Sequence, residues 1–352
     1  MTELREADRR TRKLLAIHRA FNLNGDVDRL YVKRKLGGKG LLQIEQMVRE
    51  EECAMAEYIH GRQTDWLIQC VARERVLQEQ ETKGSYRQRV KEQRMQQWKN
   101  KKMHGQFLRQ TEDLVDEEEN TKWLVDGYLK KETESLIMAA QEQSLRTRKI
   151  MHAIDHRNVD PKCRLCGQKD ETVEHLVSAC SKLAQTEYKA RHDKVASIVH
   201  WHLCKKFGIQ TEKAWYMHKA ETVCENDQCK ILWDFSIQTD RVIQARRPDI
   251  VVVDKRKDSV TIIDIAVPAD TNIAEKEQEK IMKYQDLRME VKRLWKKKTV
   301  TVVPIVVGAL GSMPRGLKKN VLALDLKGCE CRTLQKAALL GTARILRRAM
   351  SL

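Results

Sequence analysis

Two apolar segments, each carrying one aspartate, are the residues of this 352-residue chain whose types and spacing most clearly permit chemistry. The segments are Arg-Pro-Asp-Ile-Val-Val-Val at 247–253 and Val-Thr-Ile-Ile-Asp-Ile-Ala-Val-Pro at 260–268, on either side of a polar turn at 254–259. A hairpin centred between Arg256 and Lys257 pairs position 249 with position 264, so Asp249 and Asp264 should face each other. Like charges that oppose each other on neighbouring strands destabilise a sheet unless something neutralises them. A divalent cation would neutralise this pair.

The chemistry that such a pair permits is hydrolysis of a phosphodiester. Adjacent carboxylates can hold one or two Mg²⁺ ions, and a metal-bound water is the nucleophile for that reaction. The alternative is one strand-ending and one surface aspartate. Both segments are almost continuously apolar, which indicates burial on both faces and makes an unpaired carboxylate costly. We therefore expect Asp249 and Asp264 to be ligands of a catalytic Mg²⁺.

A cation near the phosphate must accompany the carboxylates. Two strand-borne acids and a nearby lysine resemble the pattern of the PD-(D/E)xK nucleases, but the position two residues after Asp264 is Ala266. The expected helix at 274–296 offers a replacement on one face, at i, i+4, i+7 and i+8: Lys276, Lys280, Lys283 and Tyr284. A lysine there could stabilise the charged phosphate or orient the water. The alternative is a solvated basic stripe.

A second constellation has the spacing of a metal site: Cys163-x2-Cys166-x8-His175-x4-Cys180. Three thiolates and one imidazole suit a tetrahedral Zn²⁺, and four protein ligands make that zinc structural rather than catalytic. The alternative is four residues that merely pack together. The zinc would hold a basic loop with Lys162 and Arg164 for contact with nucleic acid. The remaining cysteines lack such a pattern and are expected to be buried or free thiols: Cys53, Cys70, Cys204, Cys224, Cys229, Cys329 and Cys331.

Composition indicates the class of partner. Lysine and arginine outnumber aspartate and glutamate by 67 to 50, a net charge of +17, and only 5% of residues are aromatic. Nucleic acid or another polyanion is the natural partner of such a surface, although a soluble basic protein with exposed charged helices has the same composition. We expect an intracellular protein, because no secretory signal is seen and no apolar run reaches the ~18 residues that cross a bilayer. No membrane partner is expected.

Periodicity divides the chain into six expected segments. These are helices at 1–60 with a glycine turn at 37–40, a charged helical linker at 61–120, helices at 121–160, the zinc knuckle at 161–182, a nuclease domain at 183–312 and a basic helical tail at 313–352. Within 183–312 we expect a helix at 188–207, a strand at 231–237, the hairpin, the helix at 274–296 and a strand at 300–307. This order predicts an α/β fold, a mixed sheet with helices packed on it.

Together these motifs resemble the C-terminal region of non-LTR retrotransposon proteins of the restriction-like-endonuclease class. The resemblance covers residues 5–312 and is carried by four patterns: the C-C-H-C knuckle, Arg191-His192-Asp193-x-Val195, Arg247-Pro248-Asp249-x14-Asp264 and Lys280-x2-Lys283-Tyr284. Upstream, Asp26-Val27-Asp28-Arg29-Leu30-Tyr31 and the glycine turn look like the thumb-side segment after a reverse transcriptase palm.

The resemblance implies a restriction-like nuclease core that nicks target DNA, so that the free 3′ end primes reverse transcription in the nucleus. It implies metal binding by Asp249 and Asp264, catalysis by Lys280 or Lys283 and a supporting role for Tyr284. Contacts to DNA would involve Arg191, His192 and Arg247. DNA is the expected partner, with element RNA as a second.

Two departures bear on this resemblance. No Tyr/Phe-x-Asp-Asp motif is present, so we expect the polymerase part to lie upstream in a longer protein, and Lys33 stands where the thumb-side turn would have proline. Two other functions stay open: a catalytically silent nucleic-acid-binding remnant, and a resolvase-like enzyme acting on branched DNA.

Overall fold

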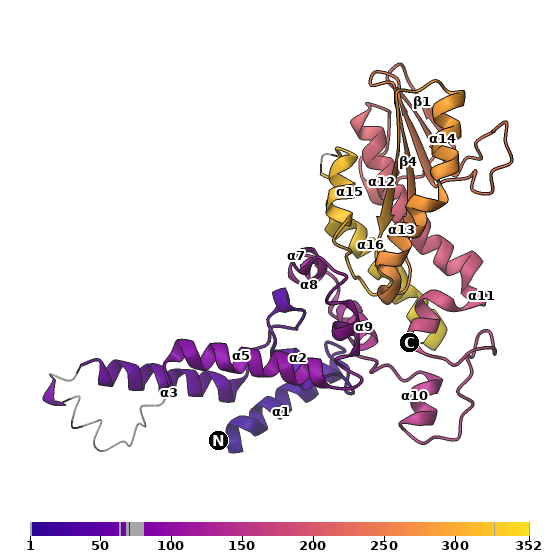
Figure 1. The fold of residues 1–352 in the computed structure, drawn as a ribbon. Coiled ribbons are helices and arrows are strands. Elements are labelled where there is room, and N and C mark those ends of the chain that lie inside the picture. Colours follow the sequence, from indigo (N-terminus) through magenta and orange to yellow (C-terminus); the bar gives the residue numbers. More distant parts are fainter. Residues whose placement is uncertain (1, 63–64, 68–69, 71–80, 327, 352) are drawn as a thin grey trace. The chain divides into compact units, whose positions relative to one another are not determined.

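The structure is a computed structural model that describes residues 2–62, 65–67, 70, 81–326 and 328–351 (Figure 1). It divides the chain into two compact units. The first comprises 1–109 and 130–144, and the second comprises 110–129 and 145–352. Part of the linker expected at 61–120 lies outside the described residues, at 63–64, 68–69 and 71–80.

The first unit is helical in its described part, as expected. Its helices are α1 (Thr2–Ile17), α2 (Val27–Tyr31), η1 (Arg34–Leu36), α3 (Ile44–His60), α5 (Lys83–Asn100) and α9 (Lys131–Gln141), and α6 (Gln106–Thr111) runs from it into the second unit. Helix α5 packs against α2 and α3, so this part of the charged segment is a docked helix. Trp98 on α5 is buried, and the guanidinium of Arg29 stacks 4.9 Å from its ring centroid.

The glycine turn of this unit is structural. Gly37 and Gly40 have φ angles of 90° and 77°, which favour glycine. A Cβ on Gly38 would lie 2.0 Å from the carbonyl oxygen of Val32, so the turn needs a residue without a side chain there. The carbonyl of Gly37 accepts a hydrogen bond of 2.9 Å from Nε of Arg29. The expected glycine turn is thus present, and it contributes to the packing of Arg29.

The second unit contains a five-stranded mixed sheet, which confirms the α/β class. Its strands are β1 (Val223–Glu225), β2 (Cys229–Trp233), β3 (Ile250–Asp254), β4 (Ser259–Ala266) and β5 (Thr299–Val306), in that spatial order. Neighbours from β1 to β4 are antiparallel, and β4 and β5 are parallel. The predicted strands at 231–237 and 300–307 and the predicted hairpin segments at 247–253 and 260–268 correspond to β2, β5, β3 and β4. The three-residue edge strand β1 was not predicted from the sequence.

The expected hairpin register is confirmed. Ile250 pairs with Ile263, and the same antiparallel register brings position 249 opposite position 264, one residue before β3 begins. Valine and isoleucine fill both strands because β-branched side chains suit a pleated, buried surface. From Ile262 to Ala266, every residue of β4 is buried.

Helices cover both faces of the sheet (Figure 1). One face packs on α12 (Lys189–Lys206), α15 (Leu317–Ala323) and α16 (Cys331–Met350). The other packs on α13 (Ile273–Lys283) and α14 (Gln285–Leu294). The single helix expected at 274–296 is therefore two, separated at Tyr284, and the segment expected as a tail at 313–352 contributes Leu334 and Ala338 to the core of the first face.

Short helices complete the second unit. They are α7 (Glu117–Asn120), α8 (Lys122–Val125), α10 (Arg148–Ala153), η2 (His175–Ala179), α11 (Ser181–Leu183), η3 (Ala184–Tyr188), η4 (Trp215–Met217) and η5 (Asp270–Asn272). The helical stretch expected at 121–160 is thus divided, with α9 in the first unit and α8 and α10 in the second. No helix of the described residues is long and apolar enough to cross a membrane.

Candidate functional site

Asp264 lies on β4, which has a neighbouring strand on each side, and is buried, with 2% of its side chain exposed. Alternation along β4 places it on the face of Ile262, which packs on α13 and α14. A carboxylate in this position requires partners, because an isolated buried charge is costly. Its partners come from the end of α13.

Three of the four residues predicted to share one helical face contact this carboxylate. The hydroxyl of Tyr284 donates a hydrogen bond of 2.6 Å to Oδ1 of Asp264. Lys280 forms an ion pair with Oδ2, and Nζ of Lys283 lies 4.0 Å from Oδ1. The fourth, Lys276, instead pairs with Glu279 on the helix surface.

The break between α13 and α14 explains how Tyr284 reaches the sheet. Tyr284 has φ −104° and ψ 11°, outside the geometry of either helix, and its side chain is fully buried. Burial, together with the charge of Asp264, raises the pKa of Tyr284 far above its ordinary range, so the phenol keeps its proton and acts as a donor. Lys280 has 16% of its side chain exposed and Lys283 has 39%, so Lys280 is the more enclosed cation.

Asp249 has different partners. Its Oδ2 accepts a hydrogen bond of 2.6 Å from the backbone N–H of Ile265 on β4. The same oxygen lies 3.1 Å from Nε2 of His192, which also lies 3.2 Å from the carbonyl oxygen of Ile265. The imidazole of α12 therefore bridges the carboxylate before β3 and the backbone of β4.

His192 lies between two carboxylates, because its Nδ1 is 3.1 Å from Oδ1 of Asp193. Burial lowers the pKa of this imidazole, but the hydrogen bonds and charges of Asp193 and Asp249 outweigh burial and raise it to about 9. For Asp249, burial raises the pKa, but His192, the Ile265 amide and the charge of Lys280 outweigh it, so its pKa lies below the ordinary value. His192 is thus an imidazolium at neutral pH, and the positive charges of His192 and Lys280 both act on Asp249.

A cavity of about 380 Å³ opens beside Asp249. Its polar lining includes Lys189, His192, Asp193, Asp234 and Asp249. Arg247 lies nearby in the chain with 63% of its side chain exposed, and its guanidinium donates to the carbonyl and carboxylate of Asp234. The predicted DNA-contact residue Arg247 is therefore at the surface, and His192 is beside Asp249.

Arg191, the third residue expected to contact DNA, lies in the interior. Its guanidinium donates a hydrogen bond of 2.8 Å to Oγ1 of Thr342 and one of 3.1 Å to the carbonyl oxygen of Val267. It also stacks on the ring of Tyr188. Burial lowers the pKa of Arg191 to about 10. A Cβ on Gly341 would lie 2.6 Å from Cγ of Arg191, so α16 makes room for it with a glycine. In this structure Arg191 joins α12 to α16 and also lines the cavity beside Asp249.

The oxygen atoms around Asp249 are of the kind that binds a hard divalent cation. Carboxylate oxygens of Asp249 and Asp264 and the carbonyl oxygen of Ile265 are the oxygen donors that Mg²⁺ prefers. Both carboxylates are, however, paired with cationic side chains of the chain itself. Neither aspartate belongs to a cluster of three or more metal-ligating side chains within the described residues.

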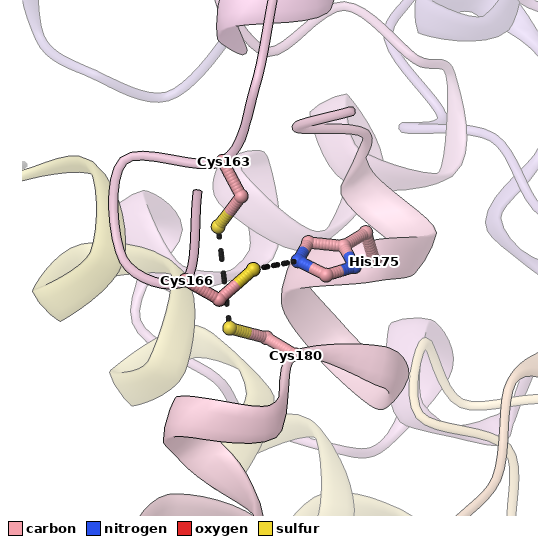
Figure 2. Close-up of side chains that lie close together, drawn as sticks. All are labelled: Cys163, Cys166, His175 and Cys180. Carbon is pink, nitrogen blue, oxygen red and sulfur yellow. Dashed lines mark hydrogen bonds between the residues drawn. The ribbon is translucent and has the colours of Figure 1, made fainter. Parts of the chain in front are cut away.

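The predicted zinc ligands come together. The ligand atoms of Cys163, Cys166, His175 and Cys180 all lie within 4.8 Å of one another. Figure 2 shows the sulfurs and the His175 ring directed at a common centre, with Cys163 and Cys166 on one loop, His175 on a helix and Cys180 before the next helix. The cluster could hold one metal ion.

Its dimensions fit tetrahedral zinc. Zn–S bonds of about 2.3 Å and Zn–N bonds of about 2.05 Å give S···S edges of about 3.8 Å and S···N edges of about 3.5 Å. The Sγ atoms of Cys163 and Cys180 are 4.0 Å apart, and Sγ of Cys166 is 3.3 Å from Nε2 of His175. Burial and the neighbouring sulfurs of Cys163 and Cys166 raise the pKa of Cys180 to about 11, whereas burial is outweighed by backbone hydrogen bonds from Gln168 and Lys169 and a hydrogen bond with His175 at Cys166, whose pKa falls to about 6.

The fold around the knuckle is held by polar contacts of its own. Gly167 has φ 65° and its N–H donates to the carbonyl of Cys163, which closes the loop. Glu171 is fully buried and accepts 2.9 Å and 2.7 Å hydrogen bonds from Nε and Nη2 of Arg164. Lys162 pairs with Asp170. The two basic side chains that were expected to face nucleic acid, Lys162 and Arg164, therefore form ion pairs with carboxylates of the knuckle.

A second cluster of metal-ligating side chains was missed from the sequence. It comprises His200, Cys204 and His218, whose ligand atoms also lie within 4.8 Å of one another. We expected Cys204 to be an ordinary buried or free thiol. The four-residue spacing of His200 and Cys204, which places both on one face of a helix, was the available signal.

Comparison with known proteins does not assign this chain to a family. The sequence matches no model of a protein family and no curated protein. The function of these sites is therefore inferred from their geometry and chemistry.

Proposed function

We propose that this chain is a Mg²⁺-dependent DNA endonuclease with a structural zinc knuckle, derived from a retroelement of the restriction-like-endonuclease class. The observation that carries the proposal is the arrangement around Asp264, where Lys280, Lys283 and Tyr284 converge on a buried strand carboxylate opposite the position of Asp249. These are the residues that the sequence pattern predicted to bind the metal or to assist in cleaving the phosphodiester.

Each of these residues has a distinct role. Asp249 and Asp264 would hold Mg²⁺, which when bound supplies an activated water and charge stabilisation at the phosphate. Tyr284 donates to Asp264 and orients its carboxylate. Lys280 brings a positive charge to the same carboxylate and would stabilise the developing negative charge on a phosphate bound there. Arg247, exposed beside Asp249 in the chain, is placed for a contact to the DNA backbone.

Plasmid nicking tests this proposal. The full chain with Mg²⁺ should convert supercoiled plasmid to open circles, and Asp249→Asn or Asp264→Asn should lower the rate by about 10³-fold or more, because each removes a charged metal ligand. The control is Asp240→Asn, whose carboxylate is 66% exposed and pairs with Arg293 on the surface. Intact plasmid under conditions where the protein binds DNA would contradict the proposal.

A second candidate is a nucleic-acid-binding protein without nuclease activity. The observation in its favour is that His192 and Lys280 already neutralise the two carboxylates. This function predicts binding that weakens steeply as salt rises, because phosphate contacts release counterions, and no cleavage at any Mg²⁺ concentration. Measuring binding and nicking in the same series of salt and Mg²⁺ concentrations separates the two candidates.

A further inference from the structure

The second His/Cys cluster lies on three segments of the second unit. His200 and Cys204 are on α12, one turn apart, His218 follows η4, and Cys224 lies on the edge strand β1. His200, Cys204 and Cys224 are buried, and only 5% of the His218 side chain is exposed. A cluster of two imidazoles and two thiols enclosed in this way matches the donor set of structural zinc sites.

The distances within the cluster are close to those of a tetrahedral zinc site. Nδ1 of His200 lies 2.8 Å from Nε2 of His218 and 3.6 Å from Sγ of Cys204. Tetrahedral zinc requires N···N edges of about 3.3 Å and S···N edges of about 3.5 Å. The imidazole pair must therefore open by about half an ångström, while the Cys204 to His200 edge already fits.

His218 is held with its lone pair toward this centre. Its Nδ1 lies 2.6 Å from Oε2 of Glu212, so the carboxylate accepts the Nδ1 proton. The neutral ring then carries its lone pair on Nε2, the nitrogen that faces His200 and Cys204. A carboxylate that accepts the remote N–H of a histidine is the usual outer partner of a metal-bound imidazole. His175 in the knuckle has no such partner for Nδ1 among the described residues.

Cys224 supplies a fourth donor. Its Sγ lies 4.0 Å from Nε2 of His200. Cys224 lies outside the three residues whose ligand atoms are all within 4.8 Å of one another, so its side chain would have to rotate to bring its sulfur to their shared centre. The donor set would then be two nitrogens and two sulfurs.

We propose that His200, Cys204, His218 and Cys224 bind a second structural Zn²⁺ that fastens α12 to the segment after it and to β1. This site is independent of the nuclease proposal. It has a mechanical consequence, because His192 stands eight residues before His200, about 12 Å along the same helix. A metal at this point would fix the helix that presents His192 to Asp249.

Metal content of the full chain tests the proposal. Purified protein should hold two zinc ions per chain by elemental mass spectrometry. His218→Ala should lower this to one, and the double variant Cys163→Ser with Cys166→Ser should also lower it to one, by emptying the knuckle. His152→Ala, at an exposed histidine outside both clusters, should keep two. A zinc that His218→Ala retains in full, whether the unaltered chain holds one zinc or two, would overturn the proposal, whereas a single zinc lost in His218→Ala would place the failure in the knuckle.

A second variant decides the matter if His218→Ala does not fold. Glu212→Gln keeps every ligand and changes a side chain that is 39% exposed, so the fold should persist. Loss of the outer carboxylate should lower the affinity for one of the two zinc ions by roughly 10–100-fold, as measured in competition with a chelator. Equal affinities in the variant and the unaltered chain would count against the site.

Cobalt replaces zinc as a spectroscopic probe of the fourth ligand. Thiolate-to-cobalt charge transfer gives a near-ultraviolet band, and the part of this band that comes from the second site is the part lost in His218→Ala. This part should fall to about half its intensity in Cys224→Ser, because one of the two thiolates of the site is removed. An unchanged band in Cys224→Ser would remove Cys224 from the ligand set and overturn the four-ligand site.

Discussion

Nε2 of His192 lies 3.1 Å from Oδ2 of Asp249, and Nδ1 of the same ring lies 3.1 Å from Oδ1 of Asp193. An imidazole between two carboxylates is stabilised in its charged form. The helix α12 and the hairpin are therefore joined by a charge pair whose strength depends on pH.

The stabilisation from this pair should be greatest between about pH 4 and pH 6.5 and should decrease as pH rises toward 9. The pKa of His192 is raised from 6.5 to about 9 on folding, so its contribution is fully present below pH 6.5 and is lost as pH rises through 9. The pKa of Asp249 is lowered, so its contribution is present above its unfolded value of about 3.9 and is lost as pH falls through the folded value.

His192→Gln should therefore lower the free energy of unfolding by about 1–3 kcal/mol at pH 6.5 and by much less at pH 9.5. Urea unfolding of both proteins at the two pH values measures the difference, with the exposed His152→Gln as control. An identical loss at both pH values would show that the His192 charge does not stabilise the fold.

Tyr284→Phe tests the orientation of Asp264. The change removes the 2.6 Å hydrogen bond and leaves Oδ1 of a buried carboxylate without that donor. We expect a loss of about 1–3 kcal/mol in the free energy of unfolding, together with slower nicking. Tyr128→Phe, at a side chain that is 85% exposed, should change stability by less than about 0.5 kcal/mol. Equal losses of stability in Tyr284→Phe and Tyr128→Phe would show that the Tyr284 hydroxyl does not stabilise the Asp264 carboxylate.

Lys280 and Lys283 should differ in their effects. Lys280→Met removes an enclosed cation from a buried carboxylate and should cost about 3 kcal/mol, because the remaining charge is uncompensated. Lys283→Met removes a more exposed cation 4.0 Å away and should cost less than about 1 kcal/mol. Nicking rates should fall in the same order, and Lys276→Met, which lacks contact with Asp264, is the matched control. A larger effect of Lys283→Met on both stability and nicking would reverse this assignment.

Zinc removal from the knuckle should act locally. Cys180→Ala should release one zinc and raise backbone hydrogen exchange at residues 163–180 by about tenfold or more, equivalent to about 1.4 kcal/mol of local stability. The contacts of Glu171 with Arg164 should keep part of the loop in place. Cys70→Ser, at an exposed cysteine, should change neither quantity. Retention of the zinc in Cys180→Ala would remove Cys180 from the ligand set.

Arg191→Lys distinguishes a packing role from DNA contact. A lysine cannot reproduce both the bonds to Thr342 and Val267 and the stacking on Tyr188. We expect a loss of about 2 kcal/mol in the free energy of unfolding, with an unchanged salt dependence of DNA binding. A shallower dependence of log Kd on log salt with normal stability would instead indicate a phosphate contact.

Features that depend on short spacing could be predicted from the amino-acid sequence alone. Alternation about the turn predicted the hairpin register that brings position 249 opposite position 264, because side-chain direction repeats every two residues along a strand. The helical repeat placed Lys280, Lys283 and Tyr284 together, and Cys-x2-Cys with His-x4-Cys predicted the first metal cluster. Local geometry is sufficient for each of these.

Which distant groups meet depends on tertiary packing. Burial of Arg191 against α16 and the pairing of His192 with Asp249 result from the packing of helices and strands that lie far apart in the sequence. The second cluster needs α12, the segment after it and β1 together, and no short motif joins His200 to His218 and Cys224. Contacts of this kind arise from the burial of apolar faces by the whole domain, which a local pattern does not encode.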